Sequence, residues 1–144
     1  MKLLLISLFL LFAPPIRWIG NFDEALKQAA ESHQQILINF SGSDWCGPCI
    51  RLSTEILGTP SFENYARQHL VLVRADFPRL KKNRLSVEQT RLNEALAERY
   101  NPEGKFPYTV LTDENGKVIR SWDGFPELSP EQFVLEIVKA GTKK

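Results

Sequence analysis

Trp45-Cys46-Gly47-Pro48-Cys49 lies between an apolar run of strand length, residues 36–40, and a segment with helical periodicity, residues 50–57. Two cysteines separated by two residues at such a junction can close a small disulfide ring. At the start of a helix, free backbone amides and the helix dipole favour the thiolate of the first cysteine. The thiolate is the attacking species in disulfide exchange. The motif therefore predicts redox chemistry, with Cys46 as the nucleophile and Cys49 as the resolving thiol.

The residues around the two cysteines fit this chemistry. Gly47 allows the backbone to turn closely around the sulfur, and Pro48 falls in the first helical turn, where its missing amide hydrogen costs little. Trp45 provides a flat apolar wall beside the reactive sulfur. The alternative is that Trp45 is an ordinary residue of the hydrophobic core. The cysteine pair has two alternative interpretations. It is either half of a zinc site or a disulfide that only stabilises the fold. The zinc site lacks its other ligands, and so short a loop constrains the unfolded chain little.

Length and composition set the class of protein. The chain has 144 residues, which is enough for one compact domain. Its formal net charge of +1 argues against nucleic-acid binding, which needs a clear basic excess. Its two histidines, His33 and His69, have no neighbour at a ligand spacing, so no metal site is predicted.

The first fifteen residues read as a targeting segment. Lys2 precedes an apolar run that is too short to cross a bilayer comfortably, and Pro14-Pro15 closes it. We expect residues 1–15 to be a signal peptide or a short N-terminal membrane anchor, and residues 16–144 to be the folded domain. The alternative is a buried N-terminal helix or strand. Export predicts a location outside the cytoplasm, in the periplasm.

Periodicity and turn signals predict alternating helices and strands. Asn21 caps a first helix, Ser61 caps a helix over residues 62–69, Ser86 and Gln89 form a capping box, and Ser129-Pro130 opens the last helix. Strands are expected at 36–40, 70–75, 108–111 and 118–122, the last two joined by a hairpin turn at Asn115-Gly116. The expected apolar faces are Phe22, Ala25, Leu26 and Ala29 in the first helix, Leu92, Ala95, Leu96 and Tyr100 in the fourth, and Phe133, Ile137 and Val138 in the last. This order predicts an α/β protein with a mixed sheet, and places the cysteines at the edge where the parallel strands end.

At these residues the chain resembles the thioredoxin family. The Trp-Cys-Gly-Pro-Cys stretch matches the active-site motif of that family residue for residue, and the resemblance covers residues 20–140. It is closest to exported thioredoxin-like proteins that read Phe-Ser-Gly-Ser-Asp-Trp-Cys, here residues 40–46. The resemblance implies the thioredoxin fold, a central mixed β-sheet flanked by helices.

The resemblance also implies a substrate groove. Phe106-Pro107 precedes a strand, where the family carries a cis-proline that faces the disulfide; a trans proline at the start of the strand is the alternative. Gly124 resembles the family's glycine beside the groove. The residues implied to bind substrate are Trp45, Gly47, Pro48, Phe106 and Pro107.

The sequence departs from the family pattern at two places. Asn39 occupies the place of a buried acid, and asparagine cannot carry a proton. The stretch 77–84 lengthens the connection before the next helix. It is either a substrate-specific surface or a solvated loop.

The resemblance implies a monomeric protein-disulfide reductase that needs no cofactor. Its implied partners are protein disulfide substrates and, because the compartment is oxidising, a membrane electron donor. The competing interpretation is a thioredoxin-fold binding or chaperone module in which the cysteines are secondary.

Overall fold

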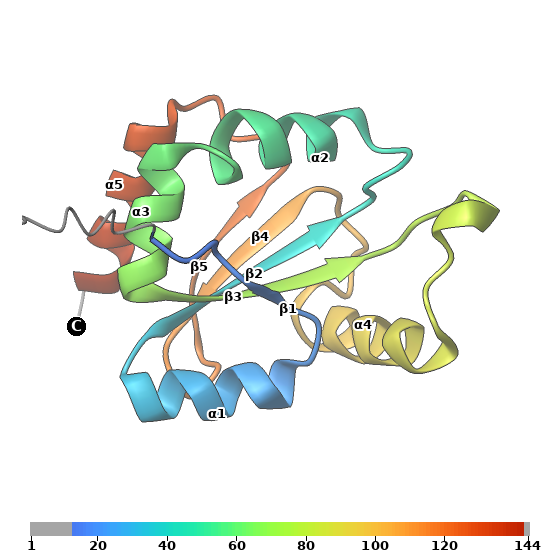
Figure 1. Cartoon of the computed structure of the whole chain (residues 1–144), viewed down its shortest axis with the longest axis horizontal. Coiled ribbons are helices and arrows are strands. Elements are labelled where there is room, and N and C mark those ends of the chain that lie inside the picture. The colour runs from blue at the N-terminus through green and yellow to red at the C-terminus, as the bar shows by residue number, and fades with distance from the viewer. Residues whose placement is uncertain (1–12, 143–144) are drawn as a thin grey trace, which may run out of the picture.

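The computed structural model describes residues 13–142 and contains a five-stranded mixed sheet (Figure 1). The strands are β1 (Trp18–Ile19), β2 (Gln35–Ser41), β3 (Leu70–Asp76), β4 (Tyr108–Thr112) and β5 (Val118–Asp123). Their order across the sheet is β1-β3-β2-β4-β5. The pairs β1–β3 and β3–β2 are parallel, whereas β2–β4 and β4–β5 are antiparallel. The predicted α/β class and thioredoxin fold are confirmed.

Helices cover both faces of this sheet. They are α1 (Phe22–Ser32), α2 (Gly47–Leu52), a π-helical turn (Ser53–Leu57), α3 (Pro60–His69), α4 (Val87–Tyr100) and α5 (Pro130–Thr142). Figure 1 shows α1 and α4 on one side of the sheet and α2, α3 and α5 on the other. No helix within residues 13–142 has the length and apolar composition needed to cross a membrane.

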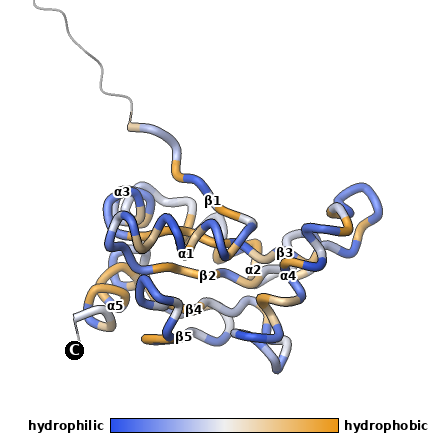
Figure 2. The backbone as a smooth tube through the Cα atoms, turned by 90° about the horizontal axis from the view of Figure 1, so that it is seen from below, coloured by the Kyte–Doolittle hydropathy of each residue, from blue (hydrophilic) through white to orange (hydrophobic). Residues whose placement is uncertain are grey.

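The sheet separates two apolar cores. One joins Leu37 and Leu111 of the sheet to residues of α2, α3 and α5, among them Phe62 and Phe133. The other lies against α1 and α4 and contains Phe40. Because β2 contributes to both cores, all but the first of its residues are buried. The tube in Figure 2 accordingly shows apolar segments along β2 and also along α5.

Local sequence explains where several helices begin. The side chain of Asn21 accepts hydrogen bonds from the amides of Asp23 and Glu24, as expected of an N-cap. Ser86 likewise accepts from the amide of Gln89. The reciprocal half of the predicted capping box is absent from the described residues, because the Gln89 side chain donates to the carbonyl of Gly20 instead.

Several expectations need correction. The strand β1 was not predicted, because two residues carry no periodicity. The helix after the cysteines begins at Gly47 and its last turn is π-helical, and α3 begins at Pro60 rather than after Ser61. Ala95 and Val138 were expected in the core, but both are exposed. Asn93 in α4 and Ala140 in α5 are buried instead.

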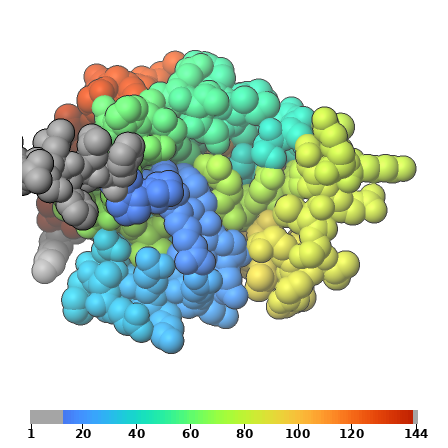
Figure 3. Space-filling view, viewed as in Figure 1, coloured from blue at the N-terminus to red at the C-terminus, as the bar shows by residue number. Residues whose placement is uncertain are grey.

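The connection from β3 to α4 projects from the body of the molecule. We call residues 77–86 the basic arm; it contains a single 3₁₀ turn, Lys81–Asn83. It is the yellow-green segment that stands out in Figures 1 and 3, beside the loop between β2 and α2. Of the predicted targeting segment 1–15, residues 1–12 lie outside the described part of the chain.

Candidate active site

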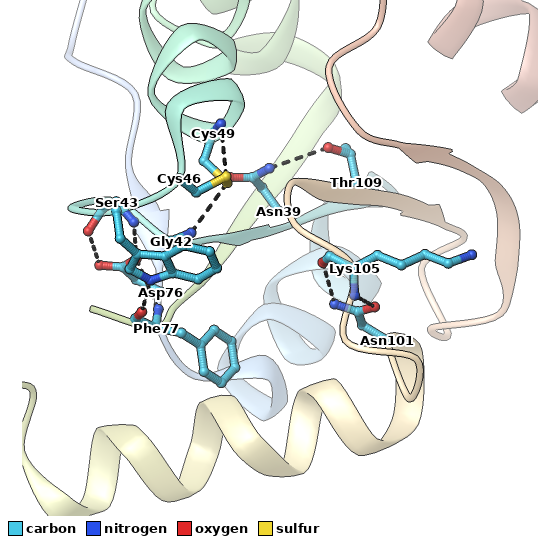
Figure 4. The surroundings of a disulfide bond; sticks show 11 residues. Asn39, Gly42, Ser43, Cys46, Cys49, Asp76, Phe77, Asn101, Lys105 and Thr109 are labelled. Carbon is cyan, nitrogen blue, oxygen red and sulfur yellow. Dashed lines mark hydrogen bonds between the residues drawn. A yellow bond between two sulfur atoms is a disulfide. The ribbon is translucent and has the colours of Figure 1, made fainter. Parts of the chain in front are cut away.

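A disulfide joins Cys46 and Cys49 where β2 ends and α2 begins. Cys46 is the N-cap residue of α2, and its Sγ accepts a hydrogen bond from the amide of Cys49 at 3.2 Å. The amide of Gly42 donates to Cys49 Sγ at 3.4 Å (Figure 4). Each sulfur therefore has a backbone donor that would favour its thiolate once the disulfide is reduced.

The two cysteines differ little in exposure. Cys46 is 6% exposed and Cys49 is 2% exposed, whereas Gly47 and Pro48 between them are exposed. The exposed part of the motif is thus the first turn of α2, at Gly47 and Pro48. Cys49 is the more shielded sulfur, which is the order expected of a resolving thiol.

The loop before β4 forms a second wall of the site. The Phe106–Pro107 peptide bond is cis, and Pro107 is buried. The carbonyl of Pro107 accepts a hydrogen bond from the amide of Gly124 at 2.9 Å. Gly124 has a φ of +80°, a conformation that side chains rarely adopt. This bond ties the proline loop to the end of β5.

Three aromatic rings surround the motif. The Trp45 indole donates from Nε1 to the carbonyl of Phe77 at 2.7 Å and meets the Phe106 ring edge-on at 5.5 Å. Phe77 meets the same Phe106 ring edge-on at 5.4 Å. A Cβ at Gly42 would overlap the indole, so Trp45 lies directly on the backbone of the preceding loop. Trp45 is half-buried and keeps one ring face against the arm.

Asn39 is buried beneath the disulfide. Its amide nitrogen donates to Thr109 Oγ1 at 3.3 Å, and Figure 4 shows the side chain beside the two cysteines. Its register neighbour on the other side is Arg74, whose pKa is lowered by burial. The site therefore has a neutral amide and a half-buried cation on the strands where the resemblance implies an acid.

Other carboxylates near the motif are already engaged. Both oxygens of Asp76 accept hydrogen bonds, from the amide and hydroxyl of Ser43 and from the amide of Phe77. Glu55 forms a two-point ion pair with Arg51 on the exposed side of the helix. Neither group is positioned as a free proton acceptor in the oxidised protein.

Asp44 fastens the basic arm to the active-site loop. It accepts hydrogen bonds from the amides of Arg79 and Leu80 at 2.9 and 3.0 Å and from the side chain of Asn83 at 3.0 Å. The bond from the Arg79 amide is the main reason that the pKa of Asp44 is lowered. The Arg79 guanidinium lies over the Trp45 ring, 3.6 Å from its centre.

Sequence reasoning identified the motif and offered residues 77–84 as either a substrate-specific surface or a solvated loop, but it missed the contacts that Arg79 makes with Asp44 and with Trp45. The contact with Asp44 joins positions 35 residues apart, and no local pattern encodes either one. The one signal for these contacts in the sequence is an acidic residue directly before the motif, together with a lengthened loop later in the chain.

Known proteins similar to this chain agree with the architecture. A family model described as a thioredoxin-like domain matches residues 22–140. The chain is 37% identical over 105 residues to disulfide bond reductase DsbH of Chlamydia pneumoniae, with 73% of this chain and 61% of DsbH aligned. It is 35% identical over 106 residues to thioredoxin-related protein DsbJ of the same organism, with 73% of this chain and 30% of DsbJ aligned. The chain thus spans less than two thirds of either relative.

Solved structures extend the comparison over the whole chain. A DsbH oxidoreductase structure matches with a TM-score of 0.81 and 30% identity, covering 100% of this chain and 96% of that one. A thioredoxin from Thermus thermophilus matches with a TM-score of 0.67 over 90% of both chains, and at 18% identity it shows the shared fold. The chain therefore belongs to the thioredoxin family, as a thioredoxin-like domain with a Cys46–Cys49 disulfide.

Proposed function

We propose that this protein is a thiol–disulfide oxidoreductase that reduces protein disulfides outside the cytoplasm. The Cys46 thiolate attacks one sulfur of a substrate disulfide, which forms a mixed disulfide and releases the other substrate sulfur as a thiolate. The Cys49 thiolate then attacks Cys46 Sγ and releases the second substrate thiolate. Two electrons pass to the substrate, which takes up two protons, and the protein is left with its Cys46–Cys49 disulfide.

One observation carries this proposal: the disulfide lies at the N-terminus of α2, with a backbone donor on each sulfur, and the Phe106 ring of the loop before β4 packs against Trp45 of the motif. A structural disulfide would not need an exposed turn between its cysteines. The name of the relative DsbH, a disulfide bond reductase, supports the same direction of electron flow.

The substrate contacts follow from the walls of the site. We propose that an extended substrate chain passing the exposed Gly47 and Pro48 contacts Trp45 and Phe106, whose rings pack edge-on, and the backbone of Pro107. We assign these five residues to substrate binding. The rings supply apolar contact that is independent of sequence, which suits an enzyme with several protein substrates.

A reductase in an oxidising compartment needs a continuous supply of electrons. We propose that the protein is exported through residues 1–15 and receives electrons from a membrane partner. Fractionation of cells that express the full chain tests the location. Recovery in the periplasmic or membrane fraction supports export, and recovery in the cytosol alone contradicts it.

Reduction of insulin, with dithiothreitol as electron donor, tests the activity. We expect the wild type to accelerate insulin precipitation and both Cys46→Ser and Cys49→Ser to be inactive. In a separate experiment, each variant is expressed in cells and analysed on non-reducing gels without dithiothreitol; only Cys49→Ser should accumulate protein adducts that disappear with reductant, because it keeps the attacking thiolate and lacks the resolving one. Adducts on Cys46→Ser alone would reverse the two roles. A wild type that neither reduces insulin nor exchanges thiols would favour the binding-module alternative.

A further inference from the structure

We propose that the basic arm is a recognition surface that selects substrate disulfides flanked by acidic residues. The inference rests on the proposed reductase function and names the substrate class for the same site. It is carried by the charge of the arm and by the way the arm is fastened to the active-site loop.

The arm concentrates positive charge without internal compensation. Within residues 77–86 there are four cations and no acidic residue; the cations are Arg79, Lys81, Lys82 and Arg84. All four are exposed. Among the ion pairs of residues 13–142, none includes any of them.

Two other cations close to the site, Lys105 and Arg51, are neutralised by carboxylates, and Arg74 is half-buried on β3. Lys105, before the Pro107 loop, lies within 3.0 Å of Glu103 and 3.3 Å of Asp123. Arg51 on α2 pairs with Glu55. The arm is therefore the part of the site region whose positive charge remains available to a partner.

The acidic residues at the base of the arm do not neutralise the positive charge of its side chains. Asp44 accepts hydrogen bonds from arm amides and from Asn83, and Asp76 accepts from Ser43 and from the amide of Phe77. These bonds orient the backbone of the arm. Lys81 and Lys82 are exposed, and no ion pair among residues 13–142 includes either of them.

The attachment places the charge next to the reactive sulfur. Arg79 lies over the ring of Trp45, which directly precedes Cys46. Trp45 is in turn bonded to the carbonyl of Phe77 at the start of the arm. A substrate segment that crosses Trp45 to present its disulfide to Cys46 thus continues onto the arm. Leu80, 48% exposed, adds one apolar contact among the cations.

This arrangement favours acidic polypeptide over other anions. The substrate must carry a disulfide, and carboxylates beside it would pair with the arm while the sulfur reaches Cys46. Charges at a site of this kind act mainly on the rate of encounter, by about tenfold or more, and salt screens them. A solvated loop would give no dependence on substrate charge.

Three synthetic peptides with one intrachain disulfide test the inference. They are identical except for four flanking positions, which are all Glu, all Gln or all Lys. The fully reduced protein is mixed with each peptide, and its oxidation is followed by acid quenching, thiol alkylation and mass spectrometry at low and high salt. The arm variant is Lys81→Glu/Lys82→Glu/Arg84→Glu. The matched control, Lys27→Glu/Lys117→Glu/Lys139→Glu, changes net charge equally at exposed positions outside the site.

We expect the wild type and the control variant to oxidise about tenfold faster with the Glu peptide than with the Lys peptide at low salt, and salt to abolish the difference. The arm variant should invert the preference and keep its rate with the Gln peptide. Equal rates with all three peptides, or a preference that the control variant also inverts, would overturn the inference while leaving the reductase function intact. Failure to oxidise with any peptide would overturn both.

Discussion

Asn39 is a buried neutral amide below the reactive disulfide. Its replacement by an acid tests whether the site lacks a proton acceptor at this position. Asn39→Asp should raise the rate of the resolving step by roughly tenfold or more, because a carboxylate can accept the proton of Cys49 as it attacks. Burial raises the pKa of a carboxyl group, so the gain should appear as the pH rises through that raised value. Turnover of insulin measured against pH reports both effects.

A buried carboxylate also destabilises the fold, and a control must separate this cost from the chemistry. Asn93→Asp is suitable, because Asn93 is equally buried but lies in α4, on the opposite face of the sheet. Both variants should lose about 1–3 kcal/mol of unfolding free energy. Only Asn39→Asp should change the pH profile; an unchanged profile would show that the missing acid does not limit the proposed reaction.

Gly124 holds the Pro107 loop through a backbone conformation that favours glycine. Gly124→Ala should cost about 1–2 kcal/mol, because the φ of +80° is strained for a side chain even though the added Cβ would meet no atom within 4 Å. Gly47→Ala is the matched control, since its Cβ also meets nothing and its φ is unrestrictive. Urea unfolding of both variants measures the difference. Equal stabilities would show that the loop adjusts without cost.

At the scale of elements, the basic arm depends on Asp44. Asp44→Ala should increase hydrogen exchange at the amides of Arg79 and Leu80 by about tenfold, because both amides lose a charged acceptor. Ser43→Ala is the control, since its hydroxyl bonds to Asp76 and not to the arm. Amide exchange followed by NMR gives the two rates. Unchanged exchange in Asp44→Ala would mean that other contacts hold the arm.

The same anchor predicts a pH dependence. The amide of Arg79 is the main group that lowers the pKa of Asp44 from its ordinary value of 3.8. A carboxyl group with a lowered pKa on folding contributes stability that is fully present above its unfolded value and is lost as the pH falls through the folded one. The arm should therefore stay fastened at neutral pH and loosen only below about pH 3.8. NMR relaxation of the arm amides at pH 6 and at successively lower pH values below 3.8 checks this; an arm already mobile at pH 6 would contradict it.

At the scale of the whole molecule, α5 closes the core on the side of the sheet that carries the cysteines. Phe133 is fully buried there and packs against Phe62 and Trp122. Phe133→Ala should lower the unfolding free energy by about 3–5 kcal/mol, a large share of the total for a small domain. Val138→Ala, five residues on in the same helix, should change it by less than about 0.5 kcal/mol, because Val138 is 37% exposed. A large loss in Val138→Ala, measured by urea unfolding, would show that α5 presents another face to the core.

The comparison of Phe133 with Val138 also shows the reach of sequence patterns. Apolar spacing correctly placed Phe133 and Ile137 on the buried face of α5, but it could not separate them from the neighbouring Val138. Similarly, Ala95 fits the periodicity of α4 and is exposed, whereas polar Asn93 is buried because its amide reaches the carbonyl of Asp76. Hydropathy reports how readily a side chain leaves water for an apolar environment. It does not report which polar groups find hydrogen-bond partners in the fold.

The sequence by itself determined the helices and strands with clear caps and turns, the thioredoxin-like α/β class and the position of Cys46 and Cys49 at a strand-to-helix junction. These features follow from neighbours in the chain: a cap and its amide lie three residues apart, and the two cysteines also lie three residues apart. The tertiary structure alone decided the short strand β1, the hydrogen bond that joins Pro107 to Gly124, and the fastening of the basic arm by Asp44 and Trp45. Each joins segments far apart along the chain, and their approach depends on the register of the whole sheet and on the packing of both cores, which no local pattern contains.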